Sequence, residues 1–143
     1  MERDRGTDLL SGWLTLSQIQ MNVSNELEAA LQNKHQLSLN EFYMLLFLYE
    51  APDKKLRLQQ LESMIGLSQS ALSRLVSRFE AKGCGALRRY VCENDRRGVY
   101  TSLTPLGVEK LEKALSTFQS VLMQQFSKEE IQSSLQYLVH MNE

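Results

Sequence analysis

A run of eight residues without a charged side chain, Phe42 to Tyr49, constrains most strongly how this chain can fold. Ser38 lies three residues before Glu41, which is the spacing of a capping box, so we expect a helix to begin directly after Ser38. Ala51-Pro52 should end it, because proline disfavours helical geometry at the preceding residue. A helix with no polar face must be covered on every side. The run therefore predicts the central helix of a compact domain.

Long amphipathic helices are expected on both sides of this centre. Before it, apolar residues recur at helical spacing over more than five turns: Leu9, Trp13, Leu16, Val23, Leu27 and Leu31. After it, Thr104-Pro105 is typical of a helix start, because threonine caps the first turn and proline suits the first helical position. Two apolar stripes follow: Val108, Leu111, Leu115, Phe118 and Leu122, then, from Lys128, Ile131, Leu135, Leu138 and Met141.

The segment between these helices predicts two short helices and a hairpin. After the polar link 53–55, a short helix over residues 59–65 should end at Gly66, and Ser68 can cap the next helix. Gly83 and Gly85 should stop that helix, and two extended segments, 86–92 and 99–103, then flank a charged turn. The expected fold is mainly α with a small β-hairpin, an α+β class.

No export signal or membrane span is evident. Residues Met1 to Gly6 are charged and lack the apolar core of a signal peptide, and the apolar run is too short to span a bilayer. We therefore expect a soluble, cytoplasmic protein with no membrane partner, in which Cys84 and Cys92 are reduced thiols.

The sequence carries no motif of catalysis or metal binding. His35 and His140 stand alone, and no glycine-rich phosphate loop, nucleophile elbow or Cys-x-x-Cys pair is present. We expect no cofactor, no metal and no enzymatic activity. An enzyme assembled from residues distant in the sequence stays open as an alternative.

The net charge of −1 hides an uneven distribution. Between Lys54 and Arg97 the chain has 10 basic and 4 acidic residues, a charge of +6, which leaves −7 for the remainder. A local excess of arginine is typical of a surface that binds a polyanion. A solvated surface without a partner is the alternative, and charge alone does not decide between them.

The second short helix has the composition of a DNA-reading helix. Its apolar side is opposed by small and hydrogen-bonding side chains, which suit the major groove: Ser68, Gln69, Ser70, Ser73, Arg74 and Arg78. An ordinary solvated helix face is the alternative. The absence of any acid from Ser68 to Phe79 favours DNA, because a solvated face usually mixes acids with bases.

The hairpin adds a second basic element. At its tip, Asp95 can orient a neighbouring guanidinium while Arg96 or Arg97 enters a minor groove, whose negative potential favours arginine. Arg88 and Arg89, at its base, are expected to form a stripe that faces phosphates. A hairpin turn that merely contacts water is the alternative.

Two segments resemble the MarR (multiple antibiotic resistance regulator) family. They are residues 67–76, Leu-Ser-Gln-Ser-Ala-Leu-Ser-Arg-Leu-Val, and residues 95–107, in which Asp-x-Arg is followed by Leu-Thr-x-x-Gly, the family's wing signature. The chain departs from the family at Arg57, a position that is often threonine in the family. The arginine adds an expected phosphate contact. Between Gly83 and Asp95 it is also about two residues longer than the usual pattern of the family.

The resemblance implies one winged helix-turn-helix domain over residues 1–143. Residues 38–104 would bind double-stranded DNA, and residues 8–34 and 105–143 would form a homodimer. Such a bacterial regulator, most often a repressor, binds a near-palindromic operator with its recognition helices in major grooves and its wings in minor grooves.

The resemblance also implies that a signal releases DNA. A small aromatic ligand could occupy a pocket lined by Trp13, Phe42, Tyr43 and Phe47, although aromatic residues at helical spacing are more often core. Oxidation of Cys84 or Cys92 is the second candidate signal, against the commoner outcome of a cysteine without a role.

A protein-interaction module is the alternative from another functional class. Winged helices also serve in assemblies, and a fold does not fix a function. The discriminating feature is the basic middle third, which a protein-binding module has little reason to keep free of acids on the exposed helix face.

Overall fold

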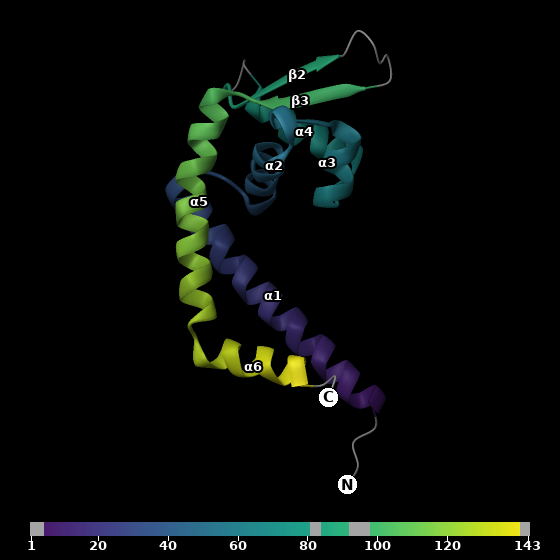
Figure 1. Ribbon diagram of the computed structural model, residues 1–143, viewed down its shortest axis with the longest axis vertical. Coiled ribbons are helices and arrows are strands. Elements are labelled where there is room, and N and C mark those ends of the chain that lie inside the picture. Colours follow the sequence, from purple (N-terminus) through teal and green to yellow (C-terminus); the bar gives the residue numbers. More distant parts are fainter. Residues whose placement is uncertain (1–4, 81–83, 92–97, 141–143) are drawn as a thin grey trace. The chain divides into compact units, whose positions relative to one another are not determined.

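The computed structural model describes residues 5–80, 84–91 and 98–140 (Figure 1). The chain divides into two compact units. The winged unit comprises residues 37–115, and the terminal unit comprises residues 1–36 together with 116–143. The predicted class, mainly helical with a small antiparallel sheet, is confirmed.

The described part of the winged unit contains three short α-helices, a 3-10 turn, a three-stranded sheet and the first half of a longer helix. Its elements, in chain order, are α2 (Leu39–Glu50), a 3-10 turn (Pro52–Lys54), β1 (Lys55–Arg57), α3 (Leu58–Ile65), α4 (Gln69–Phe79), β2 (Leu87–Val91), β3 (Val99–Leu103) and the first half of α5 (Pro105–Phe126). The hairpin strands and the helix bounds agree with the predictions to within a few residues. The helix α4 ends at Phe79, before the glycines expected to stop it.

The helix α2 forms the predicted core. Its capping box is complete, because the Glu41 amide donates to Ser38 Oγ at 3.1 Å and the Ser38 amide donates to Glu41 Oε1 at 2.7 Å. Four of its apolar side chains are buried, and none from residue 41 to 49 is exposed. Burial of one such side chain contributes about 1.5–3 kcal/mol. The buried four are Phe42, Met44, Leu45 and Leu48.

The sheet has the order β1-β3-β2, with both pairings antiparallel. The predicted polar link 53–55 is therefore wrong at its end, because Lys55 begins a strand and pairs with Ser102. A three-residue strand has too few positions to show the alternation of a half-buried strand. Its partner, β3, lies more than 40 residues further along the chain, so local sequence gives no sign of the pairing.

The turn between α3 and α4 has the expected chemistry. Gly66 ends α3 with φ of 81°, a left-handed conformation that glycine adopts at little cost. Ser68 then caps α4, since its Oγ accepts from the Ala71 amide at 3.2 Å.

The Leu-Thr-x-x-Gly motif is the joint between the hairpin and α5. The Thr104 hydroxyl lies 2.7 Å from the Gly85 carbonyl and 3.0 Å from the Ala86 carbonyl, and its oxygen accepts from the Gly107 amide at 3.1 Å. A Cβ on Gly107 would overlap the Ala86 carbonyl oxygen and approach Leu103 Cδ1 to 2.6 Å. The motif therefore has a structural explanation within this chain.

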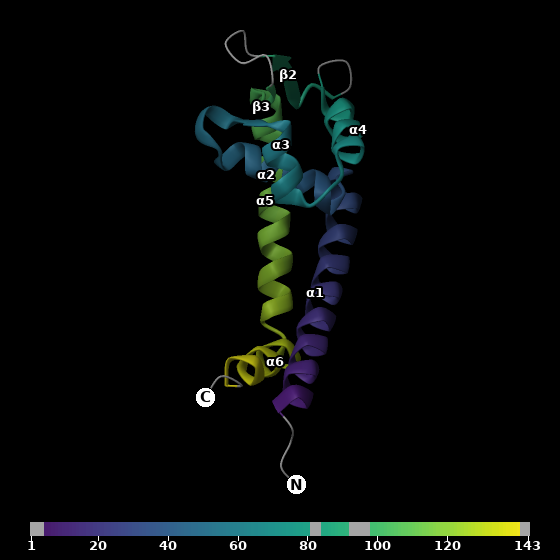
Figure 2. The ribbon, with the colours of Figure 1, turned by 90° about the vertical axis from the view of Figure 1, so that its right-hand side faces the viewer.

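The terminal unit consists of α1 (Arg5–His35), the second half of α5 and α6 (Glu129–His140). Within it, α1 and α6 lie side by side (Figure 2), and His35 Nε2 lies 2.7 Å from Thr117 Oγ1 of α5. The predicted apolar stripe of α1 is divided between two environments. Its later members, Val23, Leu27 and Leu31, are buried, whereas Leu9, Trp13 and Leu16 are exposed.

None of the helices in the described ranges is both long and apolar enough to cross a membrane.

Candidate nucleic-acid interface

The helix α4 separates a buried side from a polar exposed side. Leu72, Val76 and Phe79 are buried in the winged unit. On the other side the predicted DNA contacts are solvent-accessible: Ser68, Gln69, Ser70, Arg74 and Arg78 are exposed, and Ser73 is half-buried. This is the division that a helix needs if it is to dock on its own domain and still reach base edges in a groove.

Arg78 has an intramolecular partner as well as exposed surface. Its Nη1 lies 3.2 Å from Oε2 of Glu41, whose side chain is only 1% exposed, whereas that of Arg78 is 66% exposed. Glu41 Oε1 is already used in the capping box of α2. A buried carboxylate needs a compensating charge, so Arg78 stabilises the contact of α4 with the start of α2.

Arg57 is held at the start of α3 by a tyrosine. The Gln60 side chain accepts from the Arg57 amide at 2.9 Å, which supplies a cap that arginine itself cannot give. The Arg57 Nε donates to Tyr100 Oη at 2.9 Å, and its guanidinium lies 5.4 Å from the centre of that ring. Tyr100 in turn stacks on Tyr90, with ring centres 5.8 Å apart. These contacts orient the guanidinium of Arg57, the residue predicted to contact a phosphate.

The two faces of the sheet differ in chemistry, because successive side chains of a strand alternate. The register places one set of residues, which are charged, aromatic or hydroxylated, on the outer face: Lys55, Arg57, Arg88, Tyr90, Tyr100 and Ser102. Arg88 is exposed there. Arg89 lies on the opposite face with Leu56 and Thr101, so the predicted stripe of Arg88 and Arg89 is divided between two faces.

Arg89 contacts α4. Its Nη2 lies 3.0 Å from Glu80 Oε1, 3.3 Å from the Ser73 carbonyl oxygen and 3.4 Å from Ser77 Oγ. Its Nε is buried and has no hydrogen-bond partner among the described residues. The guanidinium therefore joins β2 to α4.

A small hollow of about 100 Å³ lies between the starts of α3 and α4 and the end of the hairpin at which β3 begins. Arg57 lines it from the start of α3, Gln69 from the start of α4, and Gly98 and Val99 from the start of β3. The fold thus brings together predicted contacts that lie 12 residues apart in the sequence. Glu62 also lines the hollow, which makes it a mixed site rather than a purely cationic one.

Comparisons with known proteins agree with this geometry. A family model described as the MarR family matches residues 35–98, just under half of the chain. The structure of Sco3205, a MarR family transcriptional regulator from Streptomyces coelicolor in complex with DNA, is 26% identical, with 90% of this chain and 82% of that chain covered and a TM-score of 0.74. AbsC, a MarR family transcriptional regulator from the same organism, is 27% identical, with 88% and 85% covered and a TM-score of 0.75.

The chain is thus similar to the MarR family, in sequence over residues 35–98 and in fold over most of its length.

The fold of this chain also matches the transcriptional regulator BldR from Sulfolobus solfataricus, at 24% identity, with 97% of both chains covered and a TM-score of 0.78. No curated protein sequence matches the chain. MarR-family proteins are transcription regulators, which are not enzymes.

Part of the predicted site lies outside the described residues. This part comprises the expected wing tip, Asp95, Arg96 and Arg97, and also Cys92. Cys84 is described and carries an exposed free thiol.

The four aromatic residues predicted to line a ligand pocket belong to two different units of this chain. Trp13 is in the terminal unit and is 64% exposed, whereas the other three are in the winged unit. Phe42 is fully buried, and Tyr43 and Phe47 are half-buried and stacked, with ring centres 6.2 Å apart. Burial raises the pKa of the Tyr43 hydroxyl. Phe42 is therefore a core residue. A place in the core was the alternative to a ligand pocket for these aromatic residues.

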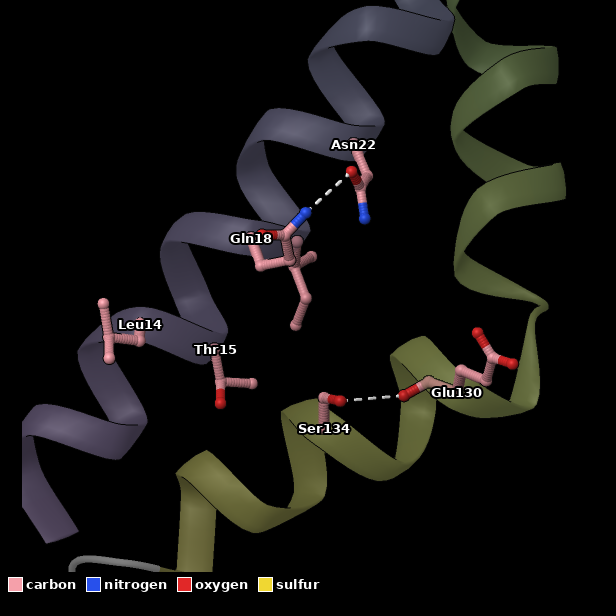
Figure 3. Close-up of a pocket in the computed structure, with 7 residues that line it drawn as sticks. Leu14, Thr15, Gln18, Asn22, Glu130 and Ser134 are labelled. Atoms are coloured by element: carbon pink, nitrogen blue, oxygen red, sulfur yellow. Dashed lines mark hydrogen bonds between the residues drawn. The ribbon is translucent and has the colours of Figure 1, made fainter.

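The terminal unit has a pocket that the sequence did not indicate. It lies between α1 and α6 and has a volume of about 390 Å³ (Figure 3). Its walls are largely polar. Gln18 and Asn22 of α1 are hydrogen-bonded to each other at 3.1 Å, and Glu130 and Ser134 face them from α6.

Sequence reasoning missed the residues that hold the basic side chains in place. Tyr90, Tyr100 and Glu80 carried no motif, and their roles depend on strand register and on the packing of β2 against α4. The one available signal was Glu80, the first acid after the acid-free helix. Its position at a helix C-terminus is electrostatically unfavourable without a cationic partner.

Proposed function

We propose that this chain is a sequence-specific transcription regulator that binds double-stranded DNA as a homodimer and represses its target genes. In this proposal α4 enters the major groove of a near-palindromic operator, and the wing reaches the neighbouring minor groove. The chain acts in the cytoplasm, where its DNA is found. The supporting observation is the exposed side of α4, which presents Gln69, Ser70 and Arg74 opposite a buried apolar side.

The chemistry of these side chains suits base recognition. Glutamine can pair with adenine, arginine can bind guanine through two hydrogen bonds, and serine permits close approach. Sco3205, which is similar to this chain, has been solved in complex with DNA. Within the winged unit, Arg57 and Arg88 add cationic groups suited to phosphates, which position a protein on the duplex without reading its sequence.

A homodimer is supported by the exposed apolar side chains of the terminal unit. Leu9, Leu10, Trp13 and Leu14 of α1 are each more than half exposed, as are Met123 of α5 and Val139 of α6. So many large apolar side chains in one small unit are typical of a protein–protein contact. Two copies would present two copies of α4 to two half-sites.

The decisive experiment is selection of bound fragments from random duplex DNA, followed by titration of the selected operator. We expect a near-palindromic site and an affinity that falls steeply with salt, because phosphate contacts release counterions.

Arg74→Ala should weaken operator binding by roughly 5- to 150-fold, the effect of one specific base contact of about 1–3 kcal/mol. Lys113→Ala, which removes an exposed cation of α5 paired with Glu109, is the matched control and should bind as the wild type does. Undiminished affinity of Arg74→Ala would contradict the proposed role of α4. Recovery of no DNA at all would favour the protein-interaction module instead.

The signal that releases DNA is proposed to be a small aromatic ligand or thiol oxidation. The half-buried pair of Tyr43 and Phe47 offers aromatic surface for the first, and the exposed thiol of Cys84 is available for the second. Titration of operator complexes with aromatic acids, and separately with peroxide, tests both. If neither treatment changes the operator affinity, both proposed signals are wrong.

A further inference from the structure

The arginines of β2 are adjacent in sequence but differ in surroundings. Arg88 is exposed on the outer face of the sheet, whereas Arg89 points to the inner face and contacts α4. An arginine committed to several acceptors in its own domain would have to break those contacts in order to bind a phosphate. The two residues are therefore expected to act on DNA by different routes.

Three groups on or just after α4 converge on the Arg89 guanidinium. Its Nη2 lies 3.0 Å from Glu80 Oε1, and the side chains of this pair are only 29% and 32% exposed. The same nitrogen lies within 3.4 Å of the Ser73 carbonyl oxygen and of Ser77 Oγ, and Ser77 Oγ itself donates to the Ser73 carbonyl at 2.9 Å. The contact thus includes the backbone of Ser73, on the exposed side of α4.

The position of Glu80 is unfavourable for a DNA-binding protein in two respects. A carboxylate directly after the last turn of α4 opposes the negative end of the helix dipole. A negative charge next to a DNA-binding helix also repels phosphates. A residue that conflicts with local rules is explained when a tertiary contact needs it, and here that contact is the ion pair with Arg89.

We propose that Arg89, Glu80, Ser73 and Ser77 form a clamp that fixes the wing strand β2 against α4. Arg89 is thereby a positioning residue. It acts on DNA binding by holding the wing and the recognition helix in the one relative placement that fits successive grooves, and it does not itself contact DNA. This inference rests on the proposed function, since it concerns the alignment of that DNA-binding surface.

Glu80→Gln is a test in which the clamp and a purely electrostatic effect predict opposite changes in operator affinity. Removal of a negative charge near DNA should strengthen binding if electrostatics alone acts. If the clamp is required, the isosteric Glu80→Gln change should weaken binding to the selected operator by about tenfold, within the range measured for residues that act through a network. Binding to a random-sequence duplex of equal length should not weaken, because it needs no alignment of the wing with α4.

The salt dependence of operator binding separates positioning from contact. A residue that neutralises one phosphate contributes about 0.9 to the slope of log affinity against log salt. Arg89→Ala should weaken operator binding and leave that slope unchanged. The double variant Arg89→Ala/Glu80→Gln should bind no more weakly than the weaker single variant, because both changes remove one interaction. Arg88→Ala, which changes an exposed residue of the outer face, is the comparison variant. Its salt slope should be lower than that of the wild type.

Glu109→Gln is the matched control for removal of a paired acid. Glu109 of α5 also forms an ion pair, with Lys113 at 3.2 Å, and among the described residues it has no hydrogen bond or ion pair with α4. It should leave operator affinity within about twofold, the usual range for a surface substitution. Circular dichroism and thermal melting of every variant establish that it is folded, and if Arg89→Ala does not fold, Glu80→Gln alone decides.

Tighter binding by Glu80→Gln, or a slope lowered by about 0.9 in Arg89→Ala, would overturn the clamp. Either result would leave the proposed function intact, provided that the wild-type chain binds the selected operator. A wild-type chain that binds neither duplex would overturn the proposed function, and the clamp with it.

Discussion

Single side chains in the winged unit decide how its positive charges are used. Arg57 and Arg88 are exposed, whereas Arg78 and Arg89 form ion pairs with Glu41 and Glu80. Counting arginines in the basic middle third therefore overestimates the number available to phosphates.

Tyr100→Phe tests the orientation of Arg57. The change removes the hydroxyl that accepts from Arg57 Nε and keeps the ring beneath the guanidinium. Because a freed arginine must be immobilised on binding, operator affinity should fall by roughly twofold to tenfold. The salt slope should stay the same, since no charge is lost, whereas Arg57→Ala should lower it by about 0.9. Unchanged affinity of Tyr100→Phe would show that Arg57 needs no such support.

The exposed polar residues of α4 were easier to predict than the residues that contact the basic side chains. Gln69, Ser70 and Arg74 follow from helical periodicity alone, because a helix puts residues three and four apart on one face. The roles of Tyr100 and Glu80 depend on contacts across 43 residues, to Arg57, and across 9 residues, to Arg89. No local pattern encodes such contacts.

At the scale of elements, the helix termini were the most predictable features. The capping box of α2, the left-handed Gly66 and the threonine cap of α5 each satisfy local backbone groups, so their sequence signals are local too. The strand β1 was missed because its formation depends on pairing with a distant strand.

Gly107→Ala tests the joint between the wing and α5. Alanine ordinarily favours a helix over glycine, but here its Cβ would overlap the Ala86 carbonyl oxygen. We expect a loss of about 1–3 kcal/mol in the free energy of unfolding, measured by urea denaturation. Gly66→Ala is the comparison, because no atom lies within 4 Å of its added Cβ and only the left-handed backbone is strained, at about 1–2 kcal/mol. A stabilised Gly107→Ala protein would contradict the close packing at this joint.

For the whole molecule, the single tryptophan provides a direct measure of association. Trp13 lies among exposed apolar side chains of α1 and is itself 64% exposed in the isolated chain. If this face forms the homodimer, its fluorescence should shift to shorter wavelength as concentration rises and back on dilution. Leu10→Glu should abolish the shift and yield a monomer in sedimentation, with little change in helix content. A tryptophan that stays solvated while sedimentation reports a dimer would place the interface elsewhere.

The separation of tasks along α4 has a consequence for engineering. Neither Gln69 nor Arg74 has a side-chain hydrogen bond or ion pair with another described residue, whereas Arg78 is tied to Glu41. Positions 69 and 74 can therefore be randomised in a library without loss of a side-chain hydrogen bond or ion pair to another described residue, while position 78 must be kept constant. Under the proposed function, a library at these two positions is a route to proteins that bind new operators while the contact of α4 with its own domain is kept.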